Sequence, residues 1–263
     1  MAETQMTLKL EDNPHVKELL DILKKHNTPG AEDLKSMIMK TAKIEEQLAA
    51  AIAEMTAMRR ELEAIREDNH PMRKVLQNTI TAMQERIDAM REQLEAMKAS
   101  IIEGGKNALA VFSERGTAAL NGIAKFFKVK PMLEEIAKIS AQGVKDNTKT
   151  IEKIERISKE YHKAGKHIKN IGRAIVGKEM IKSAKPVGKV AKAVEAPIKA
   201  ARSCNLSIRD AARSAVKSLN RLEQAASRPK PIKDQIGAAA KQAAAHNARY
   251  VSDKERPTKA AEI

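Results

Sequence analysis

The sequence predicts an all-α, elongated protein built from long helices and followed by a mostly disordered C-terminal tail. Of the 263 residues, 42% are apolar but only 2% are aromatic, so the chain lacks the bulky side chains that fill a thick core. Glycine and proline are sparse, at 11 and 9 residues, and separate segments in which apolar residues recur every three or four positions. No segment shows a convincing alternation of apolar and polar residues, so no strand is expected.

A short helix is expected first, within residues 1–29. Asn13 is a good N-cap, and Pro14 takes the first helical position, where its missing N–H costs nothing. The segment Asn27–Gly30, with sequence NTPG, should end this helix.

Residues 30–103 carry the strongest periodic signal, two runs of apolar residues spaced three and four apart. This spacing predicts two long helices with a coiled-coil seam. The seam residues singled out are Leu48, Met55, Leu62, Leu76, Ile80, Met83, Ile87, Met90, Leu94, Met97 and Ile101. The runs meet just before Pro71, and two arrangements fit: an antiparallel hairpin, favoured by the near-equal arms, or one helix kinked at Pro71. A two-helix seam is too thin to be stable alone, so it must pack on the remaining helices or on a second copy.

Shorter amphipathic helices are expected over 104–160. Gly104 and Gly105 should end the second arm, and a soft region is expected at Gly143–Asn147. An isoleucine-rich stripe, which includes Ile168 and Ile175, continues the helical pattern beyond residue 160.

Residues 161–227 form a basic segment that proline should cut into short helices. Pro186 and Pro197 each suit a helix start, and Asn205 suits the next cap. Residues 228–263 have the composition of the disordered tail.

Charge divides the chain unevenly. Residues 1–104 hold 15 Lys and Arg against 19 Asp and Glu, whereas residues 161–263 hold 23 against 8. From Lys178 to Lys192, lysines fall four and three apart, which on one helix makes a cationic ribbon beside an apolar one. The residues proposed to bind an anionic partner are Lys163, Lys166, Lys178, Lys182, Lys185, Lys189, Lys192, Lys199, Arg202, Arg209 and Arg213.

Three partners fit these cations. The backbone of nucleic acid is favoured, as a duplex, because the chain has few aromatic side chains on which unpaired bases could stack. An acidic protein bound by an adaptor is the alternative from another class. An anionic membrane surface, with Phe126 and Phe127 in contact with lipid, is the third.

No catalytic, cofactor or metal site is expected. The stretch Gly172–Glu179 resembles a phosphate-binding loop, but Glu179 stands where Ser or Thr must reach magnesium, and a charged helical segment precedes it instead of a strand. A helix end at Gly177 is therefore the better interpretation. The single cysteine excludes an internal disulfide and fits a reducing compartment, so a cytoplasmic location is expected. The N-terminus has no signal-peptide pattern, and the longest uncharged stretch, at 75–84, is too short to span a membrane.

Five segments carry a resemblance: NPHVKELLDILKKHN, NHPMRKVLQNTITAMQERI, KFFKVKPMLEE, EYHKAGKHIKNIGRAIVGKE and AKPVGKVAKAVEAPIKAARSC. Over most of residues 13–227 the chain resembles an uncharacterised family of helical proteins found on integrative and conjugative elements of gut Firmicutes. The resemblance implies a bacterial cytoplasm and a role on a mobile element, which favours DNA as the partner. It assigns no role to any residue. The function expected is that of a non-catalytic accessory protein that associates with itself or with a partner through its front half and binds nucleic acid through its basic half.

Overall fold

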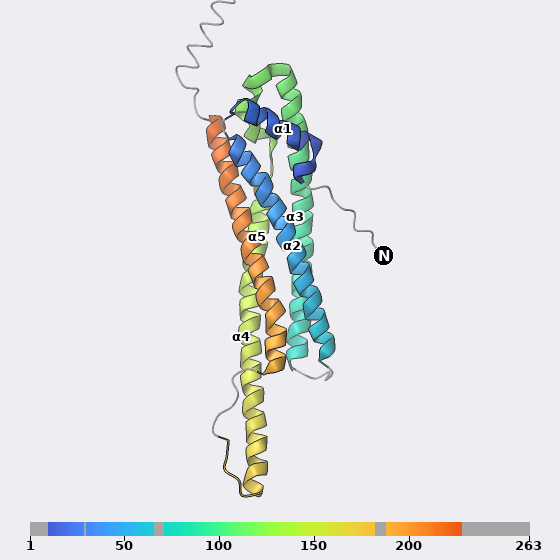
Figure 1. Ribbon diagram of the computed structural model, residues 1–263, viewed down its shortest axis with the longest axis vertical. Coiled ribbons are helices and arrows are strands. Elements are labelled where there is room, and N and C mark those ends of the chain that lie inside the picture. Colours follow the sequence, from blue (N-terminus) through green and yellow to red (C-terminus); the bar gives the residue numbers. More distant parts are fainter. Residues whose placement is uncertain (1–9, 29, 66–70, 182–187, 228–263) are drawn as a thin grey trace, which may run out of the picture. The chain divides into compact units, whose positions relative to one another are not determined.

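The structure is a computed structural model that describes residues 10–28, 30–65, 71–181 and 188–227 (Figure 1). The chain divides into two units, Met1–Ala226 and Ser227–Ile263. The predicted disordered tail, 228–263, lies outside the described residues. The regular elements within the described residues are all helical, as predicted: η1 (Leu10–Asp12), α1 (Pro14–Lys25), α2 (Ala31–Ala64), α3 (Pro71–Arg115), η2 (Gly116–Phe126), α4 (Lys130–Ile175) and α5 (Lys189–Ser227).

The start of α1 confirms the predicted cap. Asn13 Oδ1 accepts hydrogen bonds from the backbone N–H groups of His15, at 3.1 Å, and Val16, at 3.4 Å. Pro14 follows as the first helical residue. The helix ends at Lys25, and Asn27 then takes a left-handed conformation with φ of 46°, which lets the chain turn into α2.

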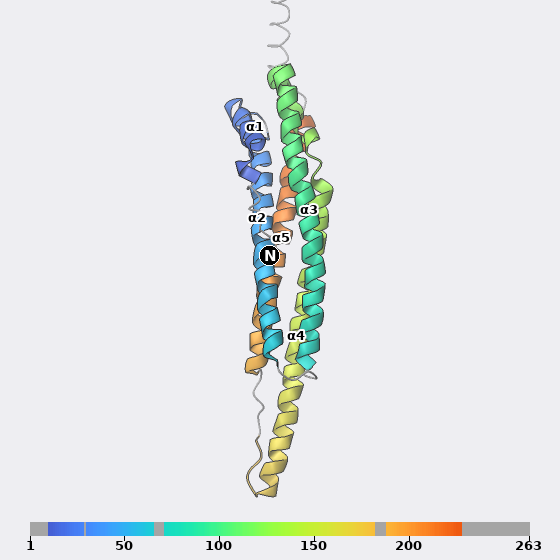
Figure 2. The same cartoon turned by 90° about the vertical axis from the view of Figure 1, so that its right-hand side faces the viewer.

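Four helices, α2 to α5, pack side by side, and each runs antiparallel to the one before it (Figures 1 and 2). The chain therefore turns back between α2 and α3, in the arrangement that the near-equal arms favoured. Ion pairs link neighbouring helices: Lys98 Nζ of α3 lies 2.9 Å from Glu45 Oε1 of α2, and Arg86 Nη2 of α3 lies 2.6 Å from Asp146 Oδ2 of α4. The ring closes where Ser218 Oγ of α5 donates to Ser36 Oγ of α2, at 3.3 Å.

The predicted seam residues lie in the core of this bundle. All are buried except Leu62, which is partly buried. Side chains of α4 and α5, including Ile136, Ile154, Ile198 and Ile208, belong to the same core. The remaining helices of the same chain thus supply the cover that a two-helix seam needs.

Helix α3 does not end at Gly104 and Gly105, so that prediction is wrong. Both glycines lie inside α3, where neighbouring segments come close. A Cβ at Gly104 would lie 2.6 Å from the carbonyl oxygen of Phe126, and one at Gly105 would meet the backbone of His15. Gly104 thus allows the close approach of η2, whereas a Cβ at Gly105 would make only an ordinary contact with α1, at 3.8 Å. The same packing buries Phe127 and partly buries Phe126, so Phe127 is not exposed as the third alternative, a membrane contact, requires.

Helices α4 and α5 are also longer than expected. Helix α4 runs unbroken through Gly143–Asn147 and across the expected boundary at residue 160, and α5 runs through Pro197 and Asn205. A Cβ at Gly143 would lie 2.9 Å from the side chain of Asn205, and Asn147 and Asn205 are buried. These residues serve contacts between helices, and tertiary packing outweighs their local preference for turns. Pro186 lies outside the described residues.

Candidate nucleic-acid interface

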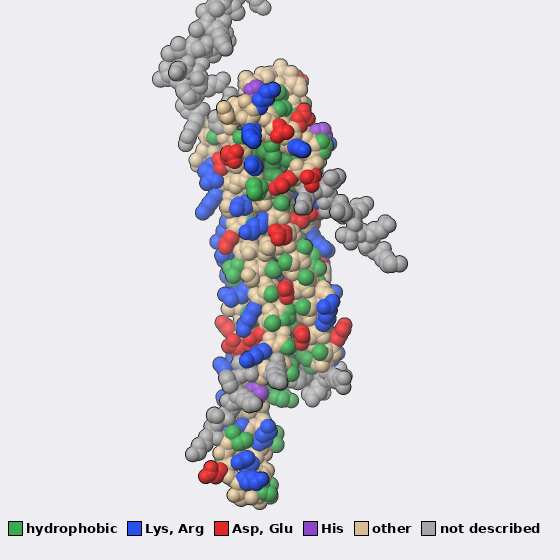
Figure 3. Space-filling model, in the orientation of Figure 1, with side chains coloured by type: hydrophobic (Ala, Val, Ile, Leu, Met, Phe, Trp, Pro, Cys, Tyr) green, Lys and Arg blue, Asp and Glu red, His purple; other side chains and the backbone are tan. Residues whose placement is uncertain are grey.

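The outward face of α5 carries a row of cationic side chains. Their spacing, of three, four or seven residues, places them within one side of the helix, opposite the buried Ala201, Ile208 and Ala215. Lysine and arginine side chains gather along the side of the bundle where α5 lies (Figure 3). We call this row the α5 basic face; its residues are Lys192, Lys199, Arg202, Arg209, Arg213, Lys217 and Arg221.

Three of these cations are held by carboxylates of the chain. Lys199 Nζ lies 2.7 Å from Glu195 Oε2, whose side chain is 6% exposed. Arg209 pairs with Asp210, at 2.9 Å, and Arg221 pairs with Asp33 of α2, at 2.8 Å. These three pairs reduce the charge that the face offers to a partner.

The other four cations have no ion-pair partner among the described residues. They are exposed, and no carboxylate of the described chain lies within salt-bridge distance; they are Lys192, Arg202, Arg213 and Lys217. Positive charge on this face is therefore concentrated in four solvated side chains.

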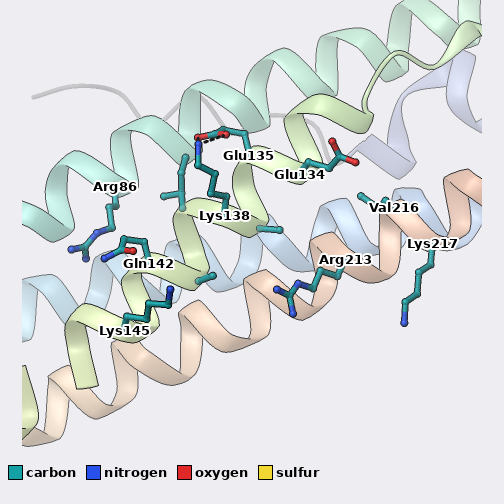
Figure 4. Close-up of a pocket in the computed structure, with 12 residues that line it drawn as sticks. Arg86, Glu134, Glu135, Lys138, Gln142, Lys145, Arg213, Val216 and Lys217 are labelled. Carbon is teal, nitrogen blue, oxygen red and sulfur yellow. Dashed lines mark hydrogen bonds and ion pairs between the residues drawn. The ribbon is translucent and has the colours of Figure 1, made fainter. Parts of the chain in front are cut away.

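A groove between α4 and α5, of about 840 Å³, adjoins this face. Its apolar lining includes Ile139 and Val216. Figure 4 shows Lys145 of α4 and Arg213 of α5 on either side of it. Lys138 and Arg86 also line the groove, but Lys138 pairs with Glu135 at 3.2 Å and Arg86 with Asp146. The net effect is a shallow apolar trough between two solvated cations.

The structure divides the predicted cationic residues among three places. Lys163 and Lys166 lie on the far part of α4, and Lys178 lies in the turn that follows it. Lys182 and Lys185 fall outside the described residues, and Lys189 is the first residue of α5. Only Lys192, Lys199, Arg202, Arg209 and Arg213 share the outward face of α5.

The ribbon predicted from Lys178 to Lys192 does not lie on one helix, because Lys178 follows the end of α4 and Lys192 belongs to α5. Helix α4 ends in a turn in which the N–H of Lys178 donates to the Arg173 carbonyl, at 2.8 Å, and that of Gly177 donates to the Ala174 carbonyl. Gly177 has φ of 64°, which glycine adopts without strain. The predicted helix end at Gly177 is confirmed, and it separates Lys178 from α5.

Three residues of the interface are not in the predicted set: Lys217, Arg221 and Lys145. Lys217 continues the four-residue spacing of Arg209 and Arg213, so periodicity could have found it. Lys145 could not be found in this way, because its place beside Arg213 depends on the packing of α4 against α5.

Cys204 lies on the inward side of α5. Burial, and then the negative charge of Glu54, raise the pKa of the Cys204 thiol. The thiol is therefore protonated at neutral pH, and the reactive thiolate is scarce.

The fold and this surface define an antiparallel helical-bundle protein with a basic outer face. None of the helices in the described part of the chain combines the length and apolarity that crossing a membrane requires. The sequence matches a family of unknown function, DUF6674, over residues 12–261, and the chain belongs to that family. A comparison with curated proteins found no match.

Proposed function

We propose that the protein binds the phosphate backbone of duplex nucleic acid through the α5 basic face. The observation that carries the proposal is the set of four solvated cations, Lys192, Arg202, Arg213 and Lys217, on one side of one helix. Lysine and arginine side chains on such a surface contact phosphates without reading base sequence. The proposed role is that of a non-catalytic accessory protein.

The length of the face suits a duplex. From Lys192 to Lys217 the helix rises about 38 Å, at roughly 1.5 Å per residue. One turn of B-form DNA is about 34–36 Å long. Cations at the two ends of the face can thus reach phosphates about one turn apart, with Arg202 and Arg213 between them.

The absence of tryptophan supports a duplex over a single strand. The chain has two tyrosines, three phenylalanines and no tryptophan, and Phe127 is buried. Unpaired bases bind by stacking on aromatic side chains, which the α5 basic face does not carry. Charge is what this face offers.

The proposal also includes a cellular location and a biological role. The resemblance to proteins of integrative and conjugative elements supports a bacterial cytoplasmic location and a role in the transfer or maintenance of such an element. The DNA of that element is then the partner we propose.

Retention of labelled duplex DNA, measured by fluorescence anisotropy at several salt concentrations, tests the proposal. If four cations neutralise phosphates, the logarithm of affinity should fall with the logarithm of salt concentration at a slope of about −4. Replacing Lys192, Arg202, Arg213 and Lys217 with Glu should lower the affinity at least about a hundredfold at low salt.

A control variant distinguishes an effect of the α5 basic face from an effect of the net charge of the protein. Replacing Lys43, Arg60, Lys74 and Arg91 with Glu changes the net charge by the same amount, but these exposed residues lie on α2 and α3. It should keep most of the affinity. Equal losses in the two variants would contradict a role for α5. If the wild type bound polyglutamate but not DNA, the result would favour the alternative function, an adaptor whose basic region binds an acidic protein.

A further inference from the structure

The last turns of α4 and the turn that follows extend beyond the neighbouring helices (Figures 1 and 2). We call residues 161–181 the α4 tip. Its apolar side chains are exposed to solvent: Ile168 is 70% exposed, Ile171 63% and Ile175 80%. Val176 and Met180 are exposed as well. In the bundle, by contrast, isoleucines of the core are buried, so most of the exposed large apolar side chains among the described residues gather at the tip.

The three isoleucines of α4 share one side of the helix, because they are spaced three and four residues apart. A shallow apolar groove continues this side toward the bundle. Ile157, Tyr161 and Ala164 line the groove, which has a volume of about 450 Å³. The exposed apolar side therefore extends over several turns.

The turn after α4 folds back on a different side. The backbone N–H of Ile181 donates to Asn170 Oδ1, at 2.8 Å, and Arg173 Nε donates to the Glu179 carbonyl, at 2.6 Å. Asn170 and Arg173 lie about 100° or more around the helix from the isoleucines. Among the described residues, these fold-back contacts thus lie on a different side of α4 from the isoleucines.

The tip is also strongly basic. Residues 161–181 contain five Lys and Arg residues and one acidic residue, Glu179. Lys163 pairs with Glu160, at 2.8 Å, and both side chains are largely exposed. The basic residues are Lys163, Lys166, Lys169, Arg173 and Lys178. Figure 3 shows basic and apolar side chains together at this end.

We propose that the α4 tip docks on an anionic lipid surface. Its isoleucines enter the boundary between headgroups and acyl chains, and its lysines and arginine contact the headgroup phosphates. An amphipathic helix with an apolar side and basic flanks binds membranes in this way, and each cation near an anionic surface adds to the affinity. The site is separate from the α5 basic face, so this inference goes beyond nucleic-acid binding.

The charge of the tip argues against a second copy as its occupant. Two tips packed through their isoleucines would bring two basic clusters together, and like charges repel. An anionic surface instead offers both an apolar layer for the isoleucines and negative charge for their neighbours. The tip is complementary to such a surface in both respects.

Tryptophan fluorescence tests the proposal directly, because the sequence contains no tryptophan. We would place one at the tip, as Ile171→Trp, and one on α2, as Met39→Trp, a position that is 53% exposed. With vesicles of phosphatidylserine and phosphatidylcholine, the emission of Ile171→Trp should shift to the blue and be quenched by brominated lipid. That of Met39→Trp should stay unchanged.

Sedimentation with the same vesicles gives the affinity. Replacing Ile168, Ile171 and Ile175 with Ser should lower vesicle binding by about a hundredfold, because three apolar side chains no longer enter the bilayer. Met39→Ser is the matched control and should bind as the wild type does. DNA retention by the triple variant should be unchanged, which separates the two sites.

Three results would overturn the proposal. The first is equal vesicle binding by the wild type and the triple serine variant, or no binding by either. The second is a blue shift of Ile171→Trp that grows with protein concentration without lipid, which would assign the tip to a second copy. The third is the same shift with polyglutamate in place of vesicles, which would assign it to an acidic protein.

Discussion

Asn205 of α5 lies against Gly143 of α4 so closely that a Cβ at Gly143 would come within 2.9 Å of its side-chain amide. Both residues are buried. The contact joins α4 and α5, the two helices that flank the apolar groove, and it explains why a glycine is placed within a long helix. A glycine in that position costs about 1 kcal/mol in helix propensity, which close packing must offset.

Gly143→Ala should therefore destabilise the protein although alanine is the better helix former. The expected loss is about 1–2 kcal/mol in the free energy of unfolding, measured with urea, because a buried amide must shift. Gly165→Ala is the matched control, since a Cβ there meets nothing within 4 Å, and it should not lower stability. Equal effects of the two variants would contradict close packing at Gly143.

The ion pair between Lys98 and Glu45 gives a second prediction. The Lys98 side chain is 7% exposed, whereas that of Glu45 is 36% exposed. Glu45→Ala should lower the free energy of unfolding by about 1–2 kcal/mol. This is less than the loss of one partner from a fully buried ion pair, because water still reaches the position of the Glu45 carboxylate. Lys98→Met keeps the packing and removes the charge, so its unfolding midpoint in urea should stay close to that of the wild type. A larger loss in Lys98→Met than in Glu45→Ala would show that the charge itself stabilises the bundle.

The Cys204 thiol predicts a dependence on pH. Its pKa is raised in the folded protein, so between the ordinary value of about 8.5 and the raised value the unfolded chain loses a proton that the folded chain keeps. Stability should fall as pH rises through this window, and it should not change for this reason below it. Thermal unfolding of the wild type and of Cys204→Ala between pH 7 and about 10 measures the difference.

Reaction with a thiol reagent is the companion measurement. In folded protein at neutral pH the reaction should be slow, because the thiol is buried and protonated, and urea should accelerate it. Fast reaction in the absence of urea would show that α5 leaves the bundle readily.

The seam allows a prediction about assembly. Leu48 and Ile87 are buried by helices of the same chain, so Leu48→Asp should lower helicity, and Ile87→Ala should cost about 2–4 kcal/mol. A homo-oligomer stays a prediction, and light scattering of the wild type measures it. If Ile87→Ala changed the molar mass in light scattering without lowering the midpoint of unfolding in urea, the seam would lie at an interface between copies of the chain.

Local signals in the sequence predicted much of the fold. Asn13 with Pro14, the turn at Gly177 and the three-and-four spacing of the seam depend on residues close in the chain, and the structure contains each of them. The expected breaks at Gly104, Gly143 and Pro197 were wrong. For the two glycines the reason is close packing against residues distant in sequence, Phe126 and Asn205.

In the candidate site, too, the sequence predicted what depends on neighbouring residues but not what depends on packing between helices. Periodicity placed Arg202, Arg209 and Arg213 on one face, but it could not place Lys145 beside them. Ile168 and Ile175 continued a stripe that resembled a core-facing one. Their exposure depends on the length of α4 relative to its neighbours, which no local pattern contains.

The ring of helices closes through hydrogen bonds between Ser36 and Ser218 and between Asp33 and Arg221, residues that are 182 and 188 positions apart. Neighbouring helices elsewhere in the ring are consecutive in the chain, so they can pair early. We therefore expect α5 to pack against α2 last during synthesis, because most of the chain must leave the ribosome before α5 is made. Over that interval the apolar groove that α5 later fills is open, and the nascent chain is at its most prone to aggregate.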